Sequence, residues 1–341
     1  MMDMKDLFER LLILRSPGVG PVAYNKLLDR FGSVSVVADY LNASSDLRDS
    51  VMREIELAQQ LNIKFITEDD SWYPLTLKQM KNHPPVISVR GNLETLSCKE
   101  FVSLVGTRHA TGVGMRFVSD IAKSFAEHGI PVVSGMAMGT DAAAHNGALQ
   151  AYGNTNTVAV LAGGVDYIWP LENENLYHEI LERGAVISDM PVGFVPKATN
   201  FVQRNRLVAG LGNRLILSEA DLNSGSMKTV QFAVQYGKQI YAIPSHPADL
   251  RAQGPNSLIR SGAAILCQGA SDFFYDGSDA KIKEKKCESE NIILDKIGSV
   301  PVSESVLADI VGKNISEIKQ ELVMLELQGK IRKNDLGYVR V

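Results

Sequence analysis

The sequence has few cysteines, no long apolar run and no excess of positive charge, and each absence argues against a class of protein. Its three cysteines, Cys98, Cys267 and Cys287, are far apart in the chain. This spacing argues against a disulfide framework and a cysteine-based zinc site, and it is typical of a reducing compartment. No apolar stretch reaches the roughly 18 residues of a membrane span, and the first residues form no signal core. We therefore expect a cytoplasmic protein with no membrane span and no bound metal.

The chain is nearly neutral, with a formal net charge of -4 over 341 residues, so an acidic partner can bind only where basic residues gather. Such a cluster is present at Arg204, Arg206 and Arg214, with Lys197 before it and no Asp or Glu between Lys197 and Arg214. Phe201 lies inside the same stretch. A cationic patch beside an aromatic residue is typical of a site for a nucleic-acid strand or another polyanion.

The start of the chain, residues 1–68, has the pattern of a small helical domain. A Gly-rich turn at Pro17-Gly-Val-Gly20 separates two helical patterns, similar to a helix-hairpin-helix or SAM-like unit. The backbone N–H groups of such a turn can hold a phosphate. A tight turn that only joins two packed helices is the other interpretation, and we favour it.

Residues 69–276 alternate short apolar runs with helical patterns. Each run is apolar on both faces, which predicts a mostly parallel sheet covered by helices on both sides, an extended Rossmann-like α/β domain. We expect the strands at Phe101–Val105, Pro131–Ser134, Thr157–Leu161, Ala185–Ser188, Arg214–Ser218, Gln239–Ile243 and Ala263–Leu266.

The chain beyond the predicted sheet has a different composition. Residues 277–287 are polar and charged, which predicts a linker. Residues 288–341 contain three helical patterns and a two-stranded ribbon closed by Asp335-Leu-Gly337, which together predict a winged helix.

Glycine-rich segments follow three successive strands of the predicted sheet, at Val105–Gly114, Val132–His145 and Leu161–Asp166. Ligands of open parallel sheets bind at the carboxyl ends of the strands, so we expect one continuous groove there. Backbone N–H groups and hydroxyls in these loops and at a later helix start are suited to an anion. The residues that we expect to form the anion-binding loops are Gly106, Thr107, Ser134, Gly135, Gly139, Thr140, Gly163, Gly164, Ser224 and Ser226.

The glycine spacing also bears on cofactors. Gly106, Gly112 and Gly114 do not fit the G-x-G-x-x-G fingerprint of dinucleotide sites, so we expect no nicotinamide and no other cofactor. A purely structural role for these turns stays open.

Asp141 and His145 lie four residues apart on one face of a predicted helix, whose start Asp141 is placed to cap. Two interpretations stay open. In one, they make a structural contact. In the other, the protein hydrolyses a nucleotide or ribosyl phosphate, with Asp141 or Glu219 as the acid/base. We favour the structural contact, because no nucleophile elbow or metal-ligand cluster accompanies the pair.

Five motifs in order make the chain resemble a known family. They are Val105-Gly-Thr-Arg108, Ser134-Gly-Met-Ala-Met-Gly-Thr-Asp-Ala-Ala-Ala-His145, Arg204-Asn-Arg-Leu-Val-Ala-Gly-Leu211, Glu219-Ala220 and Ser224-Gly-Ser-Met-Lys-Thr229. Their order is similar to that of the DNA-processing protein A family, also called Smf, over at least residues 72–275. One departure is Leu171, which replaces a basic or polar residue of the family.

The resemblance implies a non-enzymatic protein that binds single-stranded DNA, forms a homodimer and loads the RecA recombinase onto incoming strands in natural transformation. By the same resemblance, Arg108 and Lys197 match basic positions that hold the strand. The residues expected to contact DNA are Arg108, Lys197, Phe201, Arg204, Asn205 and Arg206. Arg206 is also the residue most suited to a structural ion pair with an acid such as Asp189.

A transcription regulator built on the predicted winged helix is a third hypothesis. The ribbon carries Lys330, Arg332 and Lys333, but basic and acidic residues nearly balance over residues 281–341. That balance is poor for duplex binding. Duplex binding and protein contacts therefore both stay open for this module.

Overall fold

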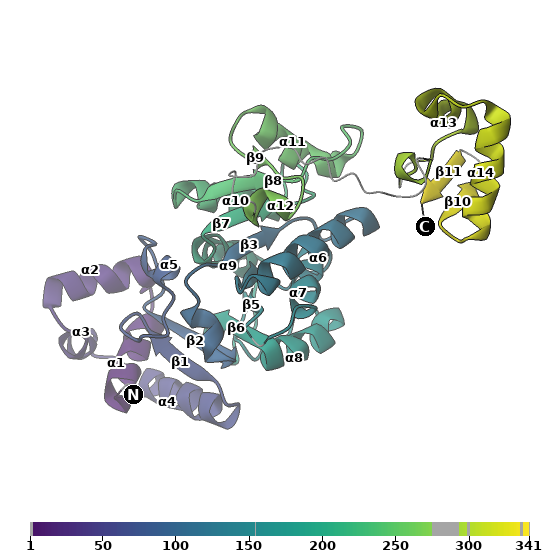
Figure 1. Cartoon of the computed structure of the whole chain (residues 1–341). Helices are drawn as coiled ribbons and strands as arrows, with labels where there is room; N and C mark the ends of the chain where they lie inside the picture. The colour runs from purple at the N-terminus through teal and green to yellow at the C-terminus, as the bar shows by residue number, and fades with distance from the viewer. Residues whose placement is uncertain (1–2, 154, 275–292, 299–300, 335–336, 341) are drawn as a thin grey trace. The chain divides into compact units, whose positions relative to one another are not determined.

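The computed structural model describes the chain as two compact units, Met1–Phe274 and Tyr275–Val341 (Figure 1). The residues that it describes are 3–153, 155–274, 293–298, 301–334 and 337–340. The predicted linker at 277–287 and the turn residues Asp335 and Leu336 lie outside them.

The first unit begins with helices packed on one another, as the sequence predicts. They are α1 (Met4–Arg15), α2 (Pro21–Phe31), α3 (Val34–Leu41) and α4 (Ser45–Gln60). Gly18, in the turn between α1 and α2, has a φ of +77°, a conformation that favours glycine. Leu11 of α1 and Tyr24 of α2 are fully buried. These helices therefore form a small domain, and one of its two apolar clusters also includes Val86 of the neighbouring sheet.

The described residues of the first unit also form one nine-stranded sheet, in the order β1-β2-β6-β5-β4-β3-β7-β8-β9. Its strands are β1 (Lys64–Thr67), β2 (Val86–Gly91), β3 (Val102–Val105), β4 (Val132–Ser134), β5 (Thr157–Val160), β6 (Gly184–Ser188), β7 (Arg214–Leu217), β8 (Gln239–Ala242) and β9 (Ile265–Leu266). The pairs β1–β2 and β2–β6 are antiparallel, and the others are parallel. The mostly parallel sheet is confirmed.

Strand β1 differs from the sequence prediction, which placed its residues in the helical domain. It has only four residues and pairs with the sheet on one side alone, through β2. Strands β3 to β8 lie close to their predicted positions, because their apolar runs are continuous and mostly buried on both faces. Strand β9 also lies at its predicted position, although Ile265 and Leu266 are exposed.

Helices cover both faces of the sheet. They are α5 (Leu75–Lys78), α6 (Gly112–Glu127), α7 (Thr140–Leu149), α8 (Glu174–Arg183), α9 (Ala198–Leu211), α10 (Gly225–Gln235), α11 (Gln253–Arg260) and α12 (Ser271–Phe274). Helices α5, α9 and α10 share one apolar cluster with the sheet, and α6, α7 and α8 pack in two clusters on the other face. Short 3₁₀ turns lie at η1 (Leu93–Ser97), η2 (Leu171–Asn173) and η3 (Leu250–Ala252).

The second unit has a core of its own. It contains η5 (Leu294–Lys296), α13 (Glu304–Val311), α14 (Ile315–Leu327) and the antiparallel pair β10 (Ile331–Asn334) and β11 (Gly337–Arg340). Leu307, Ile318, Leu322 and Tyr338 are buried in its apolar cluster. Two predicted helices and the ribbon are present, and the winged-helix assignment stays a prediction.

Three further observations apply to the described residues alone. None of their helices is long and apolar enough to cross a membrane. They contain no group of three or more His, Cys, Asp or Glu side chains arranged to hold a metal ion. Cys98 and Cys267 carry free thiols, and Cys287 lies outside the described part of the chain.

Candidate functional site

A pocket of about 650 Å³ opens at the carboxyl ends of the central strands. The chain adds β4, β5 and β6 on one side of β3 and then returns to place β7 on the other side. The loops that follow β3 and its neighbours diverge at such a point, which is where open α/β sheets bind ligands. The loop after β3, the start of α9 and the start of α10 line the pocket.

Two aromatic rings and one cation form the most distinctive part of this pocket. The guanidinium carbon of Arg108 lies 4.9 Å from the ring centroid of Trp169 and 5.8 Å from that of Phe201. The two rings are 4.4 Å apart and tilted by 60°. Arg108 is exposed, and within the described residues its guanidinium makes no hydrogen bond or ion pair. The group is therefore held in place by the rings but stays free to bind an anion.

Trp169 was not assigned a role by the sequence analysis, which considered only Phe201 for stacking. The available signal was an aromatic residue shortly after Gly163 and Gly164, at the end of a buried strand. Trp169 and Phe201 come from different segments, the loop after β5 and helix α9, so their contact depends on the tertiary fold.

Arg204 is buried and bonds to the chain itself. Its Nη1 donates to the carbonyl oxygen of Gly135 at 2.6 Å and also to that of Val160, and its Nε donates to Asn205 Oδ1 at 3.2 Å. Burial lowers the pKa of Arg204 to about 10, although the nearby Asp141 raises it. The side chain thus ties the ends of β4 and β5 to α9 and forms part of the pocket wall.

Gly135 is required by this arrangement. A Cβ at this position would lie 2.5 Å from Nη2 of Arg204, closer than real side chains approach. The glycine predicted to approach an anion therefore makes room for a buried guanidinium.

Arg206 lies outside the pocket. Its Nη2 forms an ion pair with Asp189, the partner considered in the sequence analysis, and its Nη1 donates to the carbonyl oxygen of Asn82 at 2.9 Å. Asn205, by contrast, lines the pocket, and its Nδ2 donates to the carbonyl oxygen of Gly225 at 3.2 Å. The Arg-Asn-Arg motif therefore contributes to the pocket on one side of α9 and to the domain interior on the other.

Lys197 lies at the rim of the pocket. It is exposed and precedes the first residue of α9, and its backbone N–H donates to Asn200 Oδ1 at 2.8 Å. Its neighbours Pro196 and Ala198 both line the pocket. The ammonium group of Lys197 is therefore available to an anion that enters the site.

The loop after β3 is fixed by hydrogen bonds on both sides. Gly106 and Thr107 line the pocket. Ser226 Oγ donates to the carbonyl oxygen of Gly106 at 2.5 Å. The N–H of Thr107 donates to the backbone carbonyl oxygen of Glu219 at 2.6 Å. The hydroxyl of Ser226 is therefore engaged, whereas Ser224, the N-cap of α10, presents the helix start to the pocket.

The loop after β4 packs against the loop after β3 and supports it. Ser134 is buried and donates from Oγ to the carbonyl oxygen of Leu104 at 2.7 Å. Gly139 has a φ of +75°, and a Cβ there would lie 2.5 Å from the carbonyl oxygens of Thr107 and Arg108. Thr140 is buried directly against Gly106. These residues shape the pocket without lining it.

Gly163 and Gly164 pack a third loop against the residues before α9. The N–H of Gly164 donates to the carbonyl oxygen of Phe194 at 3.0 Å. A Cβ on Gly163 would lie 2.8 Å from the same oxygen. Gly163 lines a small hollow next to the main pocket, and Gly164 lines neither.

Asp141 and His145 do not contact each other as a structural pair. Asp141 Oδ2 accepts from the N–H of Ala137 at 3.3 Å, and burial raises the pKa of its carboxyl group against the effect of Arg204. Gly139 is the N-cap of α7, so the prediction that Asp141 caps this helix is wrong. His145 Nδ1 lies 2.7 Å from Thr157 Oγ1, and burial lowers the pKa of its ring to about 3.

Glu219, the other acid of the hydrolase hypothesis, anchors the loop that carries Arg108. Its two carboxylate oxygens accept from the N–H and the Oγ1 of Thr111, at 2.7 and 2.5 Å. A Cβ on Gly114 would lie 2.7 Å from its Oε1. The carboxylates of Asp141 and Glu219 therefore hold backbone segments in place.

The fold and the pocket define a Rossmann-like protein with a cationic, aromatic-lined cleft at the carboxyl ends of its strands. Residues 64–276 match the model of the family described as DNA recombination-mediator protein A. Residues 4–55 match a DprA-like N-terminal HHH domain. The chain belongs to the DNA recombination-mediator protein A family.

Relatives and solved structures agree with this placement. Protein Smf of Escherichia coli is 29% identical over 312 residues, which are 86% of this chain and 82% of that protein. Protein Smf of Synechocystis is 33% identical over 251 residues, 73% of this chain but 57% of the relative. The crystal structure of DNA processing protein A from Streptococcus pneumoniae has a TM-score of 0.68 at 26% identity, covering 80% of this chain and 97% of that one.

A second solved structure concerns DNA processing protein A from Helicobacter pylori and its single-stranded DNA binding mode. It has a TM-score of 0.56 and 28% identity, and the match covers 62% of this chain and 94% of that one.

Proposed function

We propose that the pocket binds single-stranded DNA with little sequence preference, and that the protein acts in recombination without catalysing a reaction. The observation that carries the proposal is the free guanidinium of Arg108, which lies against the paired rings of Trp169 and Phe201. Aromatic faces accept any base, and a cation beside them accepts the backbone, so this combination favours a single strand. The single-stranded DNA binding mode reported for the Helicobacter pylori protein supports it.

In this proposal the contacts divide by chemistry. Arg108 and Lys197 bind phosphates, and the start of α10 at Ser224 offers further N–H donors. A base stacks on Phe201 or Trp169. Arg204, which the sequence analysis placed among the contacts, is assigned to the pocket wall, because its guanidinium is buried on two carbonyl oxygens.

Further partners follow from the family resemblance. We propose a cytoplasmic homodimer that protects incoming strands and loads the RecA recombinase onto them during natural transformation. Relatives named DNA processing protein DprA in Bacillus subtilis and Streptococcus pneumoniae, at 31% and 34% identity, support a role in DNA processing.

The test is a titration of single- and double-stranded DNA across a range of salt concentrations. Arg108→Ala and Lys197→Ala each weaken single-strand binding, and each lowers the slope of log K against log salt by about 0.7, the value for one lost phosphate contact on a single strand. Lys123→Ala is the control, since Lys123 is partly exposed near the far end of α6. Unchanged affinity and slope in both pocket variants overturn the proposal.

A further inference from the structure

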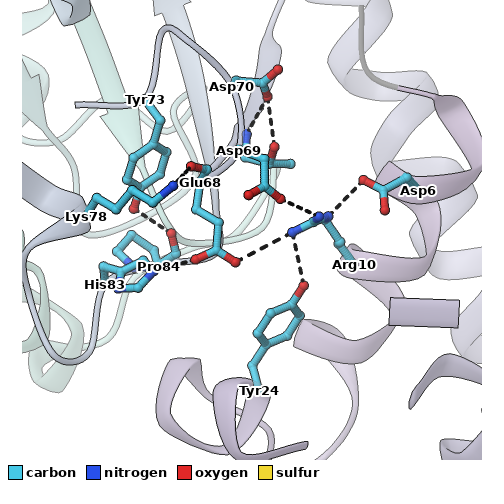
Figure 2. Close-up of polar contacts among 11 residues, drawn as sticks. Asp6, Arg10, Tyr24, Glu68, Asp69, Asp70, Tyr73, Lys78, His83 and Pro84 are labelled. Atoms are coloured by element: carbon cyan, nitrogen blue, oxygen red, sulfur yellow. Dashed lines mark hydrogen bonds and ion pairs between the residues drawn. The ribbon is translucent and has the colours of Figure 1, made fainter. Parts of the chain in front are cut away.

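Arg10, on helix α1 of the helical domain, lies at the centre of a polar network (Figure 2). It is 9% exposed, and its Nε donates to Asp6 Oδ2 at 2.8 Å. Its Nη2 lies 2.7 Å from Asp69 Oδ2, and its Nη1 lies 3.6 Å from Glu68 Oε1. The Nη1 also donates to the hydroxyl of Tyr24 at 3.4 Å. The network thus joins α1 and α2 to the residues that directly follow strand β1.

Glu68 extends this network to the segment before β2. Its Oε2 lies 2.5 Å from Nε2 of His83 (Figure 2). Nδ1 of His83 lies 3.0 Å from the carbonyl oxygen of Met80. Next to it, the hydroxyl of Tyr73 donates to the carbonyl oxygen of Pro84 at 2.6 Å. The chain at residues 82–84 is therefore fixed from several sides.

Asn82, next to His83, is the point at which the pocket helices meet this segment. Its carbonyl oxygen accepts from Nη1 of Arg206 on α9 at 2.9 Å. Its Oδ1 accepts from the hydroxyl of Tyr236, directly after α10, at 3.2 Å. A contact chain therefore runs from Arg10 through Glu68 and residues 82–83 to α9.

A second contact chain starts from the same helix and ends before α9. Arg15 donates from Nε and Nη2 to the two oxygens of Glu54, at 2.9 and 2.7 Å. Glu54 is 8% exposed, and its Oε1 accepts from the N–H of Val192 at 3.2 Å. Val192 lies a few residues before Lys197 and the start of α9. Two arginines of α1 therefore support the pocket segment at two separate points.

We infer that the N-terminal helical domain braces α9 and its preceding loop, and so positions Lys197 and Phe201 for the strand without touching it. This inference rests on the proposed function. Stacking and phosphate contacts depend on where α9 begins, and both contact chains end on that region. Arg10, Arg15 and Arg206 are then positioning residues for strand binding.

The test measures binding of a fluorescent oligo-dT strand by the full chain across salt. Arg10→Met and Arg206→Met each weaken binding by about 2- to 30-fold, the range of long-distance couplings. The salt slope falls by no more than it does in Lys197→Ala, because Lys197 is the phosphate contact that the brace positions. The affinity of the Arg10→Met/Arg206→Met double variant is no lower than that of the single variant with the lower affinity. The reason is that both residues act through one chain of contacts.

Controls separate this inference from the proposed function. Arg214→Met removes a more exposed ion pair with Glu100 at the start of β7, the opposite end of the strands from the pocket, and binds as the wild type. Arg10→Lys restores part of the affinity. If Arg10→Met does not fold, Asp69→Asn takes its place, since Asp69 is the most exposed partner of Arg10.

Each of the other possible outcomes tests either the brace or the proposed strand binding. Wild-type affinity in the Arg10 and Arg206 variants, with weakened binding in Arg108→Ala, overturns the brace alone. A salt slope in Arg10→Met that is lowered by more than in Lys197→Ala also overturns it, because that result means that Arg10 itself contacts the strand. Unchanged binding in Arg108→Ala and Lys197→Ala overturns the proposed function itself.

Discussion

The guanidinium carbon of Arg108 lies 4.9 Å from the ring centroid of Trp169, although the two residues come from loops after different strands. Glu219 holds the loop of Arg108 through Thr111, so the cation is fixed by its own segment as well as by the ring. Little side-chain freedom is left to lose when a strand binds, and a preorganised site of this kind loses less entropy on association.

Removal of the Trp169 ring is expected to weaken strand binding. Trp169→Ala deletes a stacking face and the support of Arg108, so the affinity falls by the equivalent of about 1–3 kcal/mol for one stacked base. Fluorescence anisotropy with a labelled strand measures the change. Trp72→Ala is the matched control, because Trp72 is exposed and does not line the pocket. Equal affinities of the two variants would contradict the stacking role of Trp169.

Arg204 and Lys197 are expected to differ in what they control. Arg204→Met leaves two buried carbonyl oxygens without their donor and removes the cation near the buried Asp141 carboxylate, which lowers the free energy of unfolding by about 2–5 kcal/mol. Lys197→Met leaves stability unchanged and weakens strand binding. Urea unfolding and strand titration of both variants test this division. A stable Arg204→Met protein with weak binding and a lowered salt slope would return Arg204 to the contacts.

The His83–Glu68 contact is expected to make stability depend on pH. The hydrogen bond to Glu68 is the main cause that raises the pKa of His83, with burial and Lys78 opposing it. Arg10 and Tyr73 complete the groups around this contact. The folded state therefore holds the His83 proton more tightly than the unfolded state, whose pKa is about 6.5.

It follows that the contribution of His83 is fully present below about pH 6.5 and is lost as the pH rises through the raised folded value. The difference in unfolding free energy between the wild type and His83→Gln should therefore shrink as the pH rises from about 6.5 through the raised pKa of His83 in the folded state. Urea unfolding of both proteins at stepped pH values measures it. A difference that stays constant, or that grows with pH, would show that the contact contributes no pH-dependent stability.

Gly139 is expected to tolerate no side chain. Gly139→Ala places a Cβ against the carbonyl oxygens of Thr107 and Arg108 at a positive φ, so it costs roughly 1–3 kcal/mol in strain and displaces Arg108. Both stability and strand affinity should fall. Gly112→Ala is the control, because a Cβ there meets open space in α6 and is neutral or stabilising by up to about 1 kcal/mol. Similar losses in both variants would point to glycine content rather than to the contact.

The sequence predicted the central parallel strands, β3 to β8, because their apolar runs are continuous and mostly buried on both faces, a pattern that needs no knowledge of neighbours. Strand β1 escaped prediction because Lys64-Phe-Ile-Thr67 is short and lies at an edge. The glycine loops were placed at the correct strand ends, since a parallel sheet brings its carboxyl ends to one side.

The side chains of the pocket were harder to predict than its position. Charge alone does not distinguish Arg204 from Arg206, and both turn out to bond within the chain, one under the pocket and one behind it. Trp169 follows β5 and Arg108 follows β3, so the two side chains lie together only because β5 and β3 are neighbours of β4 in the sheet. Such contacts depend on the order of strands, which local patterns do not encode.

The antiparallel pairing of β2 with β6 has a consequence for how the protein is made. Ser88 of β2 pairs with Ser188 of β6, which is 100 residues further along the chain and is therefore synthesised later. At about 5–20 residues per second, the helical domain and the antiparallel pair β1–β2 wait roughly 5 to 20 s for the strand that pairs with β2. During that interval β2 presents an open hydrogen-bonding edge, a surface with which another chain can pair.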